Sequence, residues 1–222
     1  EDHELMVLDK PYGLAVHPTA SRFKTTVTWW LSNTFPEAGI EPVHRLDAET
    51  SGLLICSKSQ TVNRTLKSAF ATGLVNKGYL ALVKGTPPAD EWVMDTPLGF
   101  DTDSAIRLRM GAGDLQASTR FSVVEKNKEL LLIEAHPETG RQHQIRVHLA
   151  MSGTPIVGDK IYGPDEGFFL AHLERDLTEE EYQLLGHHRL ALHASKIGFE
   201  LGDRKLEFHA PLAPDLRSLT KK

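Results

Sequence analysis

The chain has 222 residues, 40% of them hydrophobic, and a formal net charge of −5. No internal repeat, low-complexity tract or flexible linker divides it, so we expect a single domain over residues 1–222. Its one cysteine, Cys56, lies in an apolar run, which excludes a disulfide framework or thiolate metal cluster and favours a reducing, cytoplasmic setting. No apolar stretch approaches the ~20 residues of a membrane helix, so we expect a soluble chain, by default a monomer.

Apolar and β-branched runs bounded by glycine or proline predict several strands. A terminal hairpin is also expected, because two such runs flank a turn at Gly202 and Asp203. In chain order the predicted strands are residues 5–8, 53–57, 79–83, 119–124, 130–135 and 190–194, followed by 197–201 and 205–208 of the hairpin.

Helices are fewer. Apolar side chains recur at helical spacing over residues 59–72, where Ser59 is placed to cap the start and Gly73 the end. Residues 141–152 can form a second helix, and a third begins at Thr178, whose spacing to Glu181 is that of a capping box. Strands outnumber helices and mostly follow one another directly, which predicts an α+β fold with a large, mainly antiparallel sheet and flanking helices.

A polar segment, residues 44–52, leads straight into the predicted strand at 53–57. It contains Asp47, which therefore lies on a loop at the end of a sheet, where protein scaffolds commonly hold reactive groups. An aspartate beside an arginine, here Arg45, is more often a turn or salt-bridge residue than a catalytic one. Composition alone therefore favours a structural Asp47.

Residues 139–149 concentrate two guanidinium groups, two imidazoles and two amides. Such a density of donors suits phosphates, sugar hydroxyls and base edges. The alternative is an exposed polar helix that turns Ile145 and Leu149 toward the core, and the residues themselves leave both interpretations open. Tyr79 opens a predicted strand, where a tyrosine is usually a core residue with a solvated hydroxyl.

The sequence gives little indication of a metal site or of a catalytic serine nucleophile. The chain has 11 histidines but no His-Glu-x-x-His segment and no cysteine pair, so we expect no metal site. It also lacks the Gly-x-Ser-x-Gly segment typical of serine hydrolases.

Taken in chain order, these segments resemble the RluA-type family of pseudouridine synthases. Each segment is weak by itself, but six in the same order are hard to obtain by chance. They are residues 8–18, 44–47 with 50–52, 77–79, 140–148, 158–163 and 192–194.

This resemblance implies a bent mixed sheet with an active-site cleft across its middle. It also implies that Asp47 is the catalytic aspartate, Tyr79 the active-site tyrosine, and Arg146 the arginine that pairs with the aspartate. Arg45 matches the arginine that enters the RNA helix beside a flipped nucleotide. Because residue 8 is already in the catalytic domain, we expect no S4-type RNA-binding domain in this chain.

The implied substrate is a uridine in structured ribosomal or transfer RNA, which must leave the base stack to reach Asp47. The net charge of −5 means that RNA would be bound by local basic clusters. Isomerisation conserves atoms, so no cofactor is expected. Besides Arg45, the predicted RNA-binding residues are His44, Thr50, Arg141, His143, Gln144 and Ile145, with Arg107 and Arg109 as further candidates.

Three questions stay open at this level. The carboxylate can attack carbon, stabilise positive charge at C1′ or remove a proton from C2′. A glycoside-type hydrolase would pair Asp47 with a second carboxylate such as Glu49 or Glu138. A catalytically silent RNA-binding domain would keep the fold without using Asp47.

Overall fold

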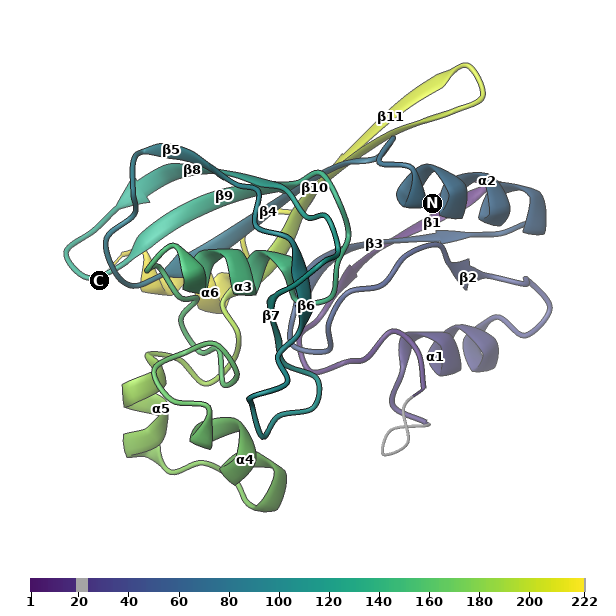
Figure 1. The fold of residues 1–222 in the computed structure, drawn as a ribbon. Coiled ribbons are helices and arrows are strands. Elements are labelled where there is room, and N and C mark those ends of the chain that lie inside the picture. Colours follow the sequence, from purple (N-terminus) through teal and green to yellow (C-terminus); the bar gives the residue numbers. More distant parts are fainter. Residues whose placement is uncertain (19–23, 222) are drawn as a thin grey trace. The chain divides into compact units, whose positions relative to one another are not determined.

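The computed structural model describes residues 1–18 and 24–221, and the chain forms two compact units (Figure 1). The first unit comprises Glu1–Lys77 and His193–Ala213, and the second comprises Gly78–Leu192 and Pro214–Lys222. Among the described residues, no helix is both long and apolar enough to cross a membrane.

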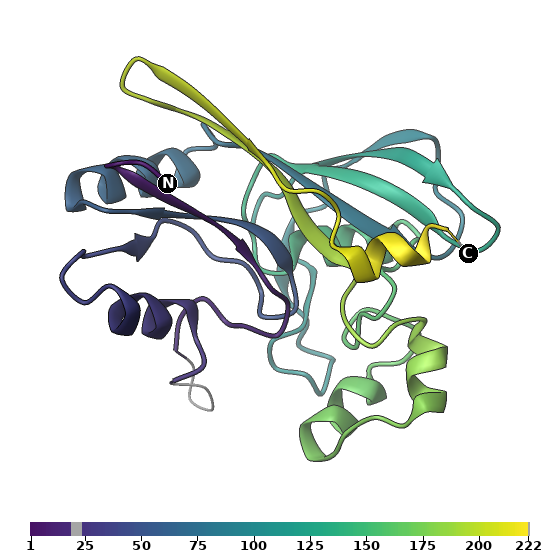
Figure 2. The same ribbon diagram turned by 180° about the vertical axis from the view of Figure 1, so that it is seen from behind.

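A sheet centred on β3 (Ser51–Ser57) organises the first unit. β1 (Leu5–Lys10) runs antiparallel to β3, and Figure 2 shows the two strands alongside each other. β10 (Leu192–Leu201) pairs with β3 in parallel and forms a hairpin with β11 (Arg204–His209), while the short β2 (Glu41–Pro42) also pairs with β3. Every residue of β3 is buried, as is typical of a strand with neighbours on both sides.

The described residues of this unit form two helices, α1 (Val27–Thr34) and α2 (Gln60–Ala71). The side chain of Ser59 accepts a hydrogen bond from the Val62 amide and so caps α2, as its sequence predicts. α2 contacts β3 and contributes to the core of the unit. The buried residues of this core are Leu5, Val43, Leu53, Ile55, Val62, Leu66, Val75, Ile197, Phe199, Leu201 and Ala210.

The second unit has an antiparallel sheet in the strand order β4-β9-β8-β5. β6 and β7 form a separate two-stranded hairpin. The bounds are β4 (Asn76–Val83, which enters this unit at Gly78), β5 (Glu91–Met94), β6 (Leu98–Phe100), β7 (Met110–Ala112), β8 (Thr119–Lys126) and β9 (Leu131–Pro137).

α3 (Gln144–Met151) contacts β7, β8 and β9 (Figure 1). α4 (Gly167–Glu174) and α5 (Glu179–Leu185) follow, and α6 (Pro214–Leu219) ends the chain. α5 has the capping box that Thr178 and Glu181 predict. α3 begins at Gln144 rather than at residue 141, because His143 has a left-handed backbone with φ of 55°.

The predicted α+β class and the mainly antiparallel pairing are confirmed. The predicted strands at 190–194 and 197–201 are parts of one continuous strand, β10. Sequence reasoning missed α1, α4 and α6, which are only six to eight residues long; apolar periodicity is also weak in α1 and α4. The bent sheet and its central cleft stay predictions.

Candidate active site

The loop that carries Asp47 connects β2 to β3 and is tied to the end of β1. The ammonium group of Lys10, a residue only 2% exposed, donates to the carbonyls of Pro11 at 2.9 Å, Leu14 at 2.8 Å and Ala48 at 3.2 Å. A buried ammonium is tolerated only when it is well hydrogen-bonded, so this arrangement fixes the position of Ala48 next to Asp47.

Backbone hydrogen bonds close the same loop. The Gly13 amide donates to the Ala48 carbonyl at 2.7 Å, and the Thr50 amide donates to the Asp47 carbonyl at 3.1 Å. Thr50 is itself buried, at 3% exposure, whereas Asp47 is half-buried. The sequence thus places the Asp47 side chain on a short connection whose backbone is held at both ends.

His44 has structural partners. Its Nε2 accepts a hydrogen bond from the Ile55 amide at 3.0 Å, and its ring stacks on Phe70 with centroids 4.4 Å apart. Burial lowers the pKa of His44 to about 3, although a backbone hydrogen bond to Arg45 opposes the shift. The ring is therefore neutral and anchors the start of the loop, while the next residue, Arg45, is exposed. The predicted contact of His44 with RNA stays a prediction.

Tyr79 lies in β4 of the second unit, opposite Ala135 of β9, and is half-buried. Farther along the strand, Ala81, Leu82 and Val83 are at most 1% exposed, so β4 is anchored in the core of its unit. Tyr79 therefore projects from a rigid element rather than from a loop.

Arg146 forms a buried two-point ion pair with Asp159. Its Nε lies 2.7 Å from Asp159 Oδ2 and its Nη2 lies 2.8 Å from Oδ1, in the planar geometry that suits a guanidinium and a carboxylate. Burial opposes ionisation of Asp159. The charge and hydrogen bonds of Arg146, with the amides of Tyr162 and Ile161, nevertheless hold its pKa below the usual value.

Tyr162 lies against the same arginine. The Arg146 Cζ atom is 5.1 Å from the centroid of the Tyr162 ring, within cation–π range. The Tyr162 hydroxyl accepts a hydrogen bond from the Met110 amide at 2.8 Å and lies 2.8 Å from Nδ1 of His143. Burial raises the pKa of Tyr162 to about 12, so it stays protonated. Tyr162 thus links Arg146 to β7 and to the start of α3.

Two predicted RNA-binding residues have roles inside the protein. The Gln144 side chain accepts from Thr139 Oγ1 and the Arg141 amide, and donates to the Ser118 carbonyl and Thr119 Oγ1. These four bonds use the whole hydrogen-bonding capacity of an amide. Ile145 is buried, at 6% exposure. Gln144 and Ile145 thus have structural roles, whereas Arg141 is exposed, and the RNA contacts predicted for all three stay predictions.

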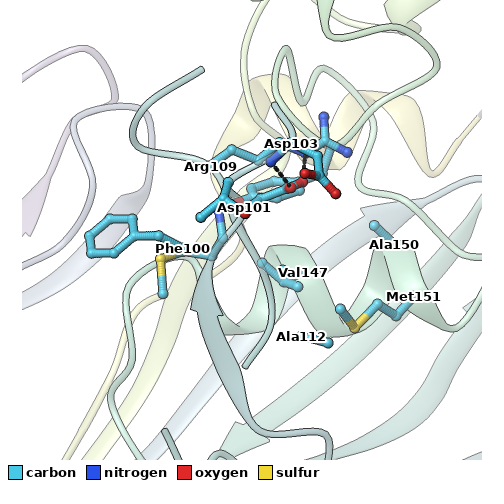
Figure 3. Close-up of a pocket in the computed structure, with 12 residues that line it drawn as sticks. Phe100, Asp101, Asp103, Arg109, Ala112, Val147, Ala150 and Met151 are labelled. Carbon is cyan, nitrogen blue, oxygen red and sulfur yellow. Dashed lines mark hydrogen bonds and ion pairs between the residues drawn. The ribbon is translucent and has the colours of Figure 1, made fainter. Parts of the chain in front are cut away.

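A pocket of about 490 Å³ lies between the β6–β7 hairpin and α3 (Figure 3). Val147, Ala150 and Met151 of α3 line it on one side, since residues three and four apart share a helix face. Arg109 also lines it, but its guanidinium is paired with Asp101 at 3.2 Å and with Glu166 at 2.8 Å. These carboxylates oppose phosphate binding, so Arg109 is a weaker RNA candidate than the exposed Arg107.

The predicted site residues thus fall into two groups. His44, Arg45, Asp47 and Thr50 lie in the first unit. Tyr79, Arg141, His143 and Arg146 lie in the second unit. The pairing of Asp47 with Arg146 and Tyr79 stays a prediction.

Sequence reasoning did not identify Lys10, Asp159 or Tyr162 as part of these arrangements. All three lie in segments that carry the family resemblance, residues 8–18 and 158–163. Their positions in those segments were the available signal, but a buried lysine or aspartate is recognisable only once its partners are known.

Comparison with known proteins gives one consistent result. A family model described as RNA pseudouridylate synthase matches residues 4–151. Ribosomal large subunit pseudouridine synthase C of Vibrio cholerae is 38% identical over 225 residues, which cover 100% of this chain and 67% of that protein. An uncharacterized RNA pseudouridine synthase of Bacillus subtilis is 32% identical over 228 residues, covering 99% of this chain and 70% of that protein. This chain thus spans about two thirds of the length of these relatives.

Among solved structures, human RNA pseudouridylate synthase domain containing 1 aligns with a TM-score of 0.75 at 24% identity. The alignment covers 97% of this chain and 84% of that one. At this identity the likeness concerns the fold, and it agrees with the α+β architecture.

Proposed function

Because the chain belongs to the RNA pseudouridylate synthase family, we propose that it isomerises specific uridines of ribosomal RNA with Asp47 as the essential catalytic group. The enzyme class follows from membership of the family. The observation that carries the choice of Asp47 is its loop. The Lys10 ammonium and backbone hydrogen bonds hold the loop that carries Asp47, just before the fully buried strand β3, in a segment that matches the family motif.

The reaction breaks the bond between N1 and C1′, turns the uracil, and joins C5 to C1′. One proton leaves C5 and one is gained at N1, so atoms balance without a co-reactant. The Asp47 carboxylate can take part by attacking carbon, by stabilising positive charge at C1′, or by removing a proton from C2′. All three routes require an ionised Asp47.

Arg146 and Tyr79 are the proposed partners of Asp47. When the extruded base covers the site, burial alone would raise the pKa of the carboxyl, and a guanidinium nearby lowers it by about 1 to 3 units. We assign that task to Arg146. Tyr79 would stack on or hydrogen-bond the base and accept a proton late in the cycle.

The proposed substrate follows from the relatives that are named as ribosomal large subunit pseudouridine synthases. Transfer RNA is the second candidate. In either RNA the uridine must be flipped out of the stack, and we assign the filling of the gap to exposed Arg45, two residues from Asp47 in the sequence. Arg107, Arg141 and His143 are the proposed contacts to the backbone of the RNA.

Replacing Asp47 with Asn tests the proposal. We expect Asp47→Asn to abolish pseudouridine formation while RNA affinity stays within about threefold, because the amide keeps the shape and loses the charge. Pseudouridine would be mapped across ribosomal and transfer RNA from cells that express the wild type, the variant or no protein. This map also identifies the modified uridine and the class of RNA.

Glu49→Gln is the matched control, two residues away on the same loop. We expect Glu49→Gln to form pseudouridine at the same uridine as the wild type. Release of free uracil, or loss of activity in Glu49→Gln together with Asp47→Asn, would indicate the two-carboxylate hydrolase instead. Unchanged modification by Asp47→Asn would remove the catalytic assignment.

A further inference from the structure

The α4–α5 segment, residues 164–186, carries apolar side chains that the protein leaves exposed. α4 is rich in phenylalanine and leucine, yet none of its eight residues, all of them described, is buried. Leu170 and Leu173 lie three residues apart, on one face of α4, and are 37% and 67% exposed. Leu184 of α5 is 70% exposed. A helix of this composition normally buries a face, so this surface is suited to a partner.

Other side chains hold the α4–α5 segment in place. Phe169 packs against the buried core of the second unit, and Leu177 and Leu185 are only 6% and 4% exposed. Figures 1 and 2 show α4 and α5 away from the sheet β4-β9-β8-β5 of the same unit. Because Leu173 and Leu184 are mostly exposed, polar residues in their place should preserve the fold.

The same segment concentrates negative charge. It has seven acidic side chains and one basic side chain, a formal charge of −6, whereas the rest of the chain has 23 acidic and 24 basic side chains, a formal charge of +1. The one basic residue, Arg175, is already paired with Glu181 at 2.7 Å. The α4–α5 segment therefore accounts for the net negative charge of the whole chain. Exposed acidic residues on the two helices and between them are Glu174, Asp176, Glu179 and Glu180.

This charge restricts what can cover the exposed leucines. RNA phosphates and the anionic surface of a membrane are both repelled by it. A second copy in a symmetric contact would bring two segments with a charge of −6 together. A helix with leucine on one face and lysine or arginine beside it complements both the apolar and the acidic side chains.

We propose that the α4–α5 segment docks a basic amphipathic helix of a partner protein. The segment lies outside residues 4–151 that match the family model, so the match does not assign it. None of its residues belongs to the proposed active site. The docking surface is therefore a second function of the chain, separate from the reaction.

The probe is a labelled synthetic peptide that has leucine at helical spacing on one face and lysine on the other. Its control has glutamate in place of lysine. Fluorescence anisotropy should show that the full chain binds the lysine peptide with a dissociation constant in the micromolar range and the glutamate peptide at least about tenfold more weakly. Equal affinity for the two peptides, or no saturable binding of the lysine peptide, would overturn the proposal.

Leu173→Ser tests the apolar part of the surface. We expect it to weaken binding of the lysine peptide about tenfold, because the leucine side chain is no longer there to be buried. Val93→Ser in β5 is the matched control, since Val93 is 52% exposed, and its affinity should stay within about twofold of wild type. Circular dichroism checks the fold, and Leu184→Ser replaces Leu173→Ser if that variant is unfolded. Wild-type affinity in the folded leucine variant would contradict docking at this surface.

Glu174→Lys tests the acidic part. Its affinity for the lysine peptide should fall about tenfold at low salt, and this difference should shrink as salt screens the charges. Glu129→Lys, at the exposed turn between β8 and β9, makes the same change outside the segment and should have little effect. A loss in Leu173→Ser without a loss in Glu174→Lys would indicate an apolar site that does not select a basic partner, and would overturn the proposal.

Two further measurements separate the other possibilities. Sedimentation velocity would assign the surface to a second copy, against the proposal, if the wild type formed a dimer that Leu173→Ser abolished. Pseudouridine formation on protein-free RNA should stay within about twofold of wild type in all these variants, and a larger loss would place the surface in the reaction instead. Peptide binding does not depend on Asp47, so failure of the proposed function would leave this test intact.

Discussion

At the scale of single residues, the position of the Asp47 loop depends on hydrogen bonds made by two polar side chains, Lys10 and His44. Lys10 donates hydrogen bonds to three backbone carbonyls. His44 accepts a hydrogen bond from the Ile55 amide in β3, the strand that follows the loop. Both side chains keep polar atoms buried only because partners are supplied by neighbouring segments. Asp47 therefore lies on a loop whose backbone is held by hydrogen bonds from neighbouring segments.

The neutral state of His44 predicts a pH dependence of stability. Its pKa is about 3 when folded and 6.5 as a reference, so the unfolded chain binds the proton more readily. The neutral His44 ring therefore makes its full contribution to the stability of the folded protein above pH 6.5. This contribution is lost as the pH falls toward 3. We expect the free energy of unfolding to decrease by up to about 1.4 kcal/mol per pH unit in this window from this group.

Urea titrations of wild type and His44→Gln at pH 7.5, 5.5 and 4.5 measure this contribution. The difference between the two proteins should shrink as the pH falls, because the variant lacks the titrating group. His148 and His187 also have pKa values lowered by burial, so the wild-type curve alone does not isolate His44. A difference that is constant over the three pH values would contradict the assignment.

At the scale of elements, two strands approach each other at a glycine. Gly52 of β3 has φ of +107°, and a Cβ added there would lie 2.2 Å from the carbonyl oxygen of Ala194 in β10. The parallel pair that joins Ala194 to Gly52 therefore requires a residue without a side chain. Asp47 lies on the loop immediately before this contact, so the close approach of the strands also determines where the Asp47 loop begins and ends.

We expect Gly52→Ala to destabilise the protein by more than about 3 kcal/mol, because the backbone of one strand must move. Gly202→Ala is the matched control. Gly202 has φ of +58°, and a Cβ there would have nothing within 4 Å. The only cost of Gly202→Ala is therefore that alanine disfavours this left-handed backbone, which lowers the free energy of unfolding by about 1 kcal/mol. Denaturant unfolding of both variants measures the difference; equal losses would mean that the contact with Ala194 is not limiting.

At the scale of the whole molecule, charge decides how RNA is held. A net charge of −5 gives no general attraction for a polyanion, so binding must depend on a few exposed basic side chains. Of the candidates, Arg107 and Arg141 are exposed, whereas Arg109 is engaged by Asp101 and Glu166. A shallow dependence of RNA affinity on salt follows from this small number of contacts.

We expect Arg107→Ala and Arg141→Ala each to reduce the slope of log affinity against log salt concentration by about 0.7 to 0.9. Lys128→Ala, at the exposed turn between β8 and β9, should leave the slope unchanged. Fluorescence anisotropy with a labelled fragment of ribosomal RNA at several salt concentrations gives the three slopes. An effect of Lys128→Ala as large as the others would indicate nonspecific attraction in place of local contacts.

The sequence alone determined the fold class, most strands and the family. Alternating and β-branched runs specify strands, and Ser59 and Thr178 mark helix starts, because these signals act between residues close in the chain. The ordered motifs likewise identified the family without reference to any contact. They also selected Asp47 as the candidate, although local chemistry by itself favoured a structural role.

Only the tertiary structure decided which side chains form hydrogen bonds and ion pairs with one another. Arg146 pairs with Asp159, thirteen residues away, and Lys10 reaches Ala48, thirty-eight residues away. Gln144 has a side chain typical of RNA contacts, but its amide makes four hydrogen bonds to residues of its own unit. A polar side chain can bind substrate or satisfy a buried backbone, and the sequence does not distinguish these uses. The distinction depends on which distant segments surround the side chain after folding.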